Sequence, residues 1–337
     1  PKLHRPQIPY PSYWTNPVEV VVPALEFGEI PSRGGDTIGL ACDGHNWLFA
    51  VEVLPREPST SSWLLTVLDA YGAAAIEPHT IQLVAPVRTL PDELLASPIS
   101  QWPSQAVELS HRQQAELCWL VVRIPQRGRF GHRTLETPVW LRNEIRQVIT
   151  PVREALSARG CRATVLNELQ FRSAIQRASF GPDVQVLGPS IETMGISDQI
   201  PIESTAAYWR FGDRYHASYE LLKANREQLA ALLDALGDNP IPAIVVSVLQ
   251  RQGDHSTEFI PCPPAMAAVV RITHLSEAGI ERAAGKLAQE LERASIKHRR
   301  LDRFHRCGFA STLPLTAELP RRSRFLPTHR PAQAPQI

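Results

Sequence analysis

The sequence predicts a mixed α+β fold built from two similar sheet-plus-helix units, each close to a ferredoxin-like split β-α-β arrangement with one extra strand. Alternating apolar residues mark hairpins and strands, apolar residues three and four apart mark helices, and the same order of elements occurs twice. We divide the chain into a proline-rich linker (1–18), a first unit (19–180), an irregular connector (181–203), a second unit (204–313) and a basic, proline-rich tail (314–337).

The first unit begins with the most specific local pattern of the chain, a hairpin over residues 37–54. Its apolar residues alternate on both sides of Asp43-Gly44, a dipeptide that favours a tight turn. A helix over residues 64–72 follows and ends at Gly72. The remaining elements are expected in the order strand, strand, helix, strand, over residues 80–87, 117–124, 137–160 and 162–166.

The second unit repeats this order. Residues 205–221 predict a hairpin that turns at Gly212-Asp213, and Asn225 is placed to cap a leucine-rich helix. Strands are expected over 243–250 and 267–274. A helix capped by Ser276 and an extended segment over 297–304 complete the unit.

The two units also match at particular residues. A shift of 165 positions takes Leu64 to Leu229 and Gly72 to Gly237, and the tetrapeptide VVRI occurs at 121–124 and at 269–272. One such identity is expected by chance, and many α/β chains alternate in this way without duplication, so a true repeat and a coincidental one both stay open. Each sheet needs cover on its second face, and we expect the units to pack together there.

Composition favours an ordinary globular protein. The net charge of +1 gives no overall field toward nucleic acid or acidic lipid. The five cysteines are scattered without a CxxC pair, which favours buried thiols in a reducing compartment. No apolar run reaches the length of about 18 residues that a membrane helix needs.

No motif of a phosphate loop, zinc protease, hydrolase elbow or dinucleotide fold occurs, so we expect no catalytic residue, metal or cofactor. The nearest approach to an anion loop is the segment 127–133, where Arg127, Arg129 and Arg133 surround two glycines. The glycines could allow backbone amides to approach and bind an anion there. A solvated loop without a ligand would have the same composition.

A second basic segment, 297–306, is a possible contact for an anion or a partner protein. It contains two histidines and the cations Lys297, Arg299, Arg300, Arg303 and Arg306. Leu301 and Phe304 between the charges suit a phosphate-rich or lipid surface, and a strand with one charged face would look the same.

The order of these pieces resembles EccE, a subunit of the type VII (ESX) secretion systems of mycobacteria and related actinobacteria. The segments that carry the resemblance are 36–40 (DTIGL), 43–51 (DGHNWLFAV), 118–123 (CWLVVR), 153–160 (REALSARG) and 163–169 (ATVLNEL). It extends over residues 30–180 and more weakly to about residue 315.

The resemblance implies a non-enzymatic component of the plasma-membrane secretion complex, assembled with EccB, EccC and EccD. It also implies membrane attachment through two helices before Pro1 and a soluble domain on the cytosolic side. Two other classes of function stay open. One is a transferase-like enzyme that binds a phosphorylated donor in a polar cleft between the units, and the other is a nucleic-acid-binding double domain.

Overall fold

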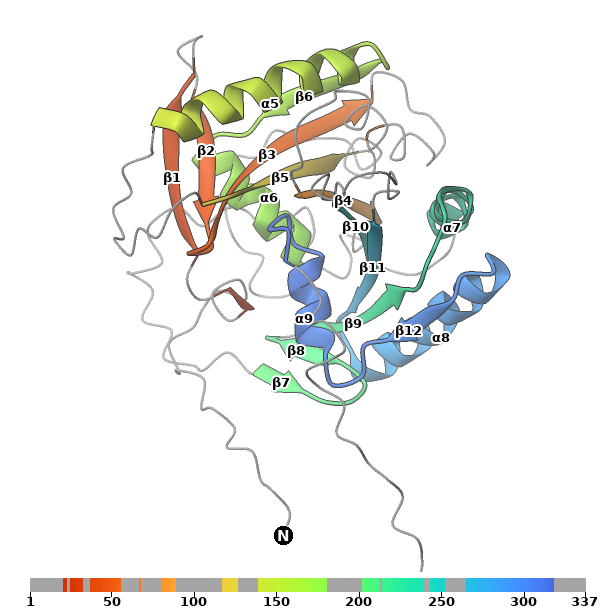
Figure 1. The fold of residues 1–337 in the computed structure, drawn as a ribbon. Helices are drawn as coiled ribbons and strands as arrows, with labels where there is room; N and C mark the ends of the chain where they lie inside the picture. The colour runs from red at the N-terminus through yellow and green to blue at the C-terminus, as the bar shows by residue number, and fades with distance from the viewer. Residues whose placement is uncertain are drawn as a thin grey trace, which may run out of the picture.

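The computed structural model describes residues 21–22, 25–32, 37–55, 67, 80–88, 117–126, 139–180, 202–212, 214–238, 243–251 and 265–317. These residues form a 12-stranded sheet with helices on both faces (Figure 1). The α+β class predicted from the sequence is confirmed. The linker 1–18, most of the connector, the tail from 318, the helix predicted over 64–72 apart from Val67, and the arginine loop 127–133 lie outside the described residues.

The first half contributes six strands and two described helices. They are β1 (Glu26–Pro31), β2 (Thr37–Cys42), β3 (Asn46–Pro55), β4 (Thr80–Arg88), β5 (Cys118–Pro125), α5 (Val139–Ser157), β6 (Cys161–Val165) and α6 (Glu168–Phe180). The predicted hairpin is β2–β3, and its turn at Gly44 has φ +86°, a conformation that glycine adopts without strain.

The second half contains six strands and three helices within the described residues. They are β7 (Ile202–Ser204), β8 (Trp209–Phe211), β9 (Arg214–Leu221), α7 (Arg226–Asp238), β10 (Ala243–Arg251), β11 (Ala265–His274), α8 (Glu277–Arg293), β12 (His298–Arg300) and α9 (His305–Ser311). The predicted hairpin is β8–β9, and Ser276 caps α8 by accepting a hydrogen bond from the amide of Gly279.

The two halves occupy mirrored places along one sheet, whose strand order is β1-β2-β3-β5-β4-β10-β11-β9-β8-β7. They meet where β4 pairs antiparallel with β10. Our expectation that the units pack face to face is therefore wrong, because they join edge to edge. At this junction the Gln82 amide donates to the Ser247 hydroxyl (2.9 Å), and these positions are separated by 165 residues, the same shift that relates the two halves in sequence.

Helices cover each face of the sheet. One face is apolar across both halves and packs against α5, α7 and α8 through residues such as Leu141, Leu232 and Leu287. The other face is covered by α6 and α9, through Phe171 and Phe309 among others (Figure 1). Sequence reasoning did not predict these two helices or the edge strands β1 and β7.

Within the described residues, no helix has the length and hydropathy needed to cross a membrane.

Candidate anion-binding site

The face of the sheet under α9 carries a row of buried polar side chains. Alternate residues of a strand point to one face, so His216 and Ser218 of β9 lie on this side together with Arg271 and Thr273 of β11. The register places Arg271 opposite Ser218 and Thr273 opposite His216. We call these four residues the polar floor.

Arg271 is the central residue of the polar floor, and its side chain is 1% exposed. Its Nη2 donates to the carbonyl oxygen of Ala178 near the C-terminal end of α6, where carbonyl groups have no helical partner. Among the described residues no carboxylate pairs with it, and its Cζ lies 4.5 Å from the centre of the Phe309 ring. Burial lowers the pKa of Arg271 to about 9, so the guanidinium still carries its charge at neutral pH.

His216 lies beside this charge and is completely buried. Its Nδ1 shares a hydrogen bond of 2.9 Å with the hydroxyl of Thr273. Burial, reinforced by the charge of Arg271, holds the pKa of His216 well below its usual value. The imidazole is therefore neutral at pH 7.

Four buried polar atoms of the polar floor have no hydrogen-bond partner among the described residues: Nε and Nη1 of Arg271, Nε2 of His216 and Oγ of Ser218. Buried polar groups are satisfied in nearly all native proteins, and a charged group left unpaired costs more than a neutral one. All four atoms can donate, His216 Nε2 in the tautomer whose Nδ1 accepts from Thr273, and their clustering on two neighbouring strands suits an anion.

Helix α9 covers the polar floor and is held by buried hydrogen bonds. His305 Nδ1 accepts from the amide of Ser218 (3.1 Å), which leaves Nε2 to donate to the carbonyl of Ala206 (3.1 Å). Gln82 donates to the carbonyl of Ser311 (2.8 Å) and accepts from the amide of Thr316 (2.6 Å). Packing is close, since a Cβ on Gly308 would come within 2.3 Å of the Ser218 Cβ.

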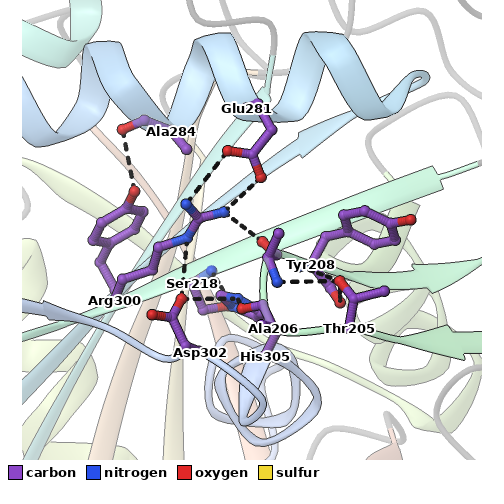
Figure 2. A network of polar contacts seen from close by, with 11 residues as sticks. Thr205, Ala206, Tyr208, Ser218, Glu281, Ala284, Arg300, Asp302 and His305 are labelled. Atoms are coloured by element: carbon purple, nitrogen blue, oxygen red, sulfur yellow. Dashed lines mark hydrogen bonds and ion pairs between the residues drawn. The ribbon is translucent and has the colours of Figure 1, made fainter.

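The basic segment 297–306, which the sequence suggested as an anion or partner contact, is largely used within the fold. Figure 2 shows Arg300 between Glu281 (2.9 Å) and Asp302 (3.4 Å), and Arg299 pairs with Glu220 (2.5 Å). Lys297 and Arg303 are exposed, and Arg306 is half-buried in α9. The alternative that we left open, a strand with one charged face, describes Arg299 and Arg300 better, because their charges are matched by carboxylates of the same half.

The other suggested anion contact, Arg127, Arg129 and Arg133, lies outside the described residues. A groove of about 410 Å³ between α5 and β6 also carries cations, Arg153 and Arg162. Both side chains are exposed and Glu154 lies with them, so the groove lacks the buried, unpaired charge that distinguishes the polar floor.

The sequence analysis did not identify Arg271, Ser218 or Thr273 as residues of a site. Arg271 belongs to the VVRI segment, which we used only as a sign of repetition. The available signal was a cation within an apolar strand, because such a residue must enter a face of the sheet. The sequence alone does not say which face Arg271 enters. The cover of that face is α9, a helix that the sequence did not predict.

No family model and no curated protein matches the chain. Among solved structures, the chain is similar to CrmK, described as a flavoenzyme of caerulomycin biosynthesis, with 10% identity over 82% of this chain and 58% of that one, at a TM-score of 0.33. It is also similar to the berberine bridge enzyme from Eschscholzia californica (10%, 77%, 41%, TM-score 0.30) and to alkyldihydroxyacetonephosphate synthase (11%, 74%, 39%, TM-score 0.32).

These three proteins are enzymes, and this contradicts our expectation of a non-enzymatic subunit of a secretion complex. The chain spans between 39% and 58% of their lengths. Because the TM-scores are low, the similarity assigns neither a flavin nor a reaction to this chain.

Proposed function

We propose that the chain is a transferase-like enzyme that holds the acidic group of a small molecule, such as the phosphate of a phosphorylated donor, on the polar floor at Arg271. The observation that carries this proposal is a fully buried guanidinium with two nitrogens that have no partner in the described part of the chain, next to the Ser218 hydroxyl, which has none there either. An anion would supply the missing charge and accept these hydrogen bonds.

The position of Arg271 supports a ligand held between the two halves. Arg271 belongs to the second half, while the carbonyl that it contacts belongs to α6 of the first. A neutral His216 can donate from Nε2 to the anion when its Nδ1 accepts the hydrogen bond from the Thr273 hydroxyl.

The test is ligand-dependent thermal stability of the wild type, an Arg271→Met variant and a matched Arg123→Met variant. Arg123 is the equivalent VVRI arginine of the first half. The probes are inorganic phosphate, pyrophosphate and a nucleoside diphosphate. At least one should raise the Tm of the wild type and of Arg123→Met by several degrees, and none should affect Arg271→Met. The proposal is wrong if no probe acts on the wild type or if Arg271→Met responds equally.

The resemblance to EccE, and the partners that it implies, remain predictions that are independent of the proposed anion site. They concern a complex that would contain the chain and leave its chemistry open. Purification of the full-length protein from membranes tests them, by asking whether EccB, EccC and EccD accompany it.

A further inference from the structure

Phe309 occupies the space next to the unpaired cation. Its ring centre lies 4.5 Å from Arg271 Cζ, 4.6 Å from the centre of the Trp209 ring and 4.8 Å from that of His216. The residue is completely buried. The phenyl ring satisfies the aromatic and cation–π contacts of this position, yet it supplies no acceptor for the unpaired nitrogens of Arg271.

Building on the anion site proposed above, we infer that its ligand is a planar aromatic anion that takes the place of the Phe309 ring, with α9 as the segment that moves aside. The aromatic part would lie against Trp209 and His216, and the acidic group would meet Arg271. Such a ligand would keep the contacts that Phe309 makes and add the hydrogen bonds that it cannot make.

The backbone around α9 is suited to this movement. The helix has seven residues, and its N-cap residue, Phe304, makes no capping side-chain hydrogen bond. A helix of this length is marginal without tertiary contacts. Arg303 before it and Thr316 after it have φ of +65° and +51°, in the left-handed region that side chains other than glycine rarely adopt. Strained residues therefore flank the segment on both sides.

Two residues hold the segment closed, one near each end. His305 binds the amide of Ser218, and Gln82 binds Ser311 and Thr316. All of these bonds are polar contacts that water can replace on opening. By contrast, Phe309, Leu313 and Leu315 are apolar and buried, so their exposure opposes opening. A ligand that buries its own ring in the space left by Phe309 would offset this cost.

Binding of phenyl phosphate and of inorganic phosphate to the wild type, Phe309→Ala and Phe309→Leu tests the inference by calorimetry. Removing the ring should make phenyl phosphate bind roughly 10- to 100-fold tighter to Phe309→Ala, the equivalent of burying one aromatic ring. Phe309→Leu, which keeps more of the packing, should show a smaller gain in the same direction. The Phe309→Ala/Arg271→Met double variant should lose the gain.

Phe171→Ala is the matched control, because the space that it opens borders Phe27 and other apolar residues, and it should gain nothing for phenyl phosphate. Hydrogen exchange of the wild type provides a measurement that needs no variant. Saturating phenyl phosphate should speed the exchange of amides in 305–313 and leave those of α6 unchanged.

The outcomes separate the two proposals. Arg271-dependent binding of inorganic phosphate, with no preference for phenyl phosphate in either Phe309 variant and no faster exchange in α9, would overturn the aromatic inference and leave the anion site standing. Absence of binding by every phosphate probe would remove the anion site itself.

Discussion

Helices α6 and α9 cover the same face of one sheet, in opposite halves, and the contrast between them is chemical. Near α6 the face presents Ala41, Leu48 and Ala50, which join Phe171 and Ile175 in an apolar cluster. Under α9 the face presents the polar floor. Helix α6 thus rests on an apolar surface, whereas α9 rests on the buried cation of Arg271 and the neutral imidazole of His216.

This difference shows where two halves with the same order of elements differ in chemistry. The face against α5, α7 and α8 is apolar throughout, as a common core requires. The opposite face gives up more hydrophobic burial in the second half than in the first, where Gln82 is buried, and the unpaired groups of the polar floor make no hydrogen bond among the described residues. Buried polar groups that lack a partner lower stability, and such groups are typical of functional sites.

The largest expected effect on the free energy of unfolding comes from removing a phenyl ring from one of the two covering helices, α6 or α9. Phe171→Ala should lower the free energy of unfolding by about 3–5 kcal/mol, because it leaves an apolar cavity. Phe309→Ala should cost less, since the space that it leaves borders unpaired polar atoms, and water can fill a polar cavity. Urea unfolding of both variants measures this difference. Equal losses would mean that the two covers are energetically alike.

We expect buried histidines of the second half, His216 and His305, to make the free energy of unfolding depend on pH. Burial lowers the pKa of His305 to about 4, so the folded state keeps it neutral while the unfolded chain takes up a proton below about pH 6.5. The neutral His305 makes its full contribution to the free energy of unfolding above pH 6.5. This contribution falls by about 3 kcal/mol as the pH decreases toward 4. His216, with a pKa shifted in the same direction, adds to this loss.

His305→Gln tests this dependence, because glutamine can accept from Ser218 and donate to Ala206 without titrating. Its unfolding free energy should fall less steeply between pH 6.5 and 4, by up to about 1.4 kcal/mol per pH unit. His45→Gln, at an exposed turn of the first half, is the control. An unchanged slope in His305→Gln would show that the buried imidazole is not the source.

The two VVRI arginines should respond to methionine with opposite signs. Replacing a buried, unpaired charge with an apolar residue of similar size often stabilises, so Arg271→Met should gain roughly 1–4 kcal/mol. Arg123 is half-buried and its Nη2 donates to the Thr80 hydroxyl (3.1 Å), so Arg123→Met should lose about 1 kcal/mol. A large loss in Arg271→Met would instead make Arg271 a structural clamp on α6.

Local patterns predicted the parts of this fold that are determined by local chemistry. Asp43-Gly44 and Gly212 set the hairpin turns, and Ser276 begins α8, as their residue types require. The pairing of β4 with β10 could not be predicted, because any two strand edges satisfy the same backbone groups. The polar floor was hidden for a related reason. His216 and Arg271 are far apart in sequence, and only the pairing of β9 with β11 brings them together.

The smallest predicted effect on stability is at the junction of the halves, where β4 pairs with β10. Ser247→Ala removes one of the two bonds that the Gln82 amide donates, while the bond to Ser311 remains. We expect a loss of about 1 kcal/mol in urea unfolding, with a single transition, because β4–β10 pairing still joins both halves into one sheet. Separate transitions for the two halves would show instead that the Gln82–Ser247 hydrogen bond is needed to couple them, and that each half can unfold as an independent domain.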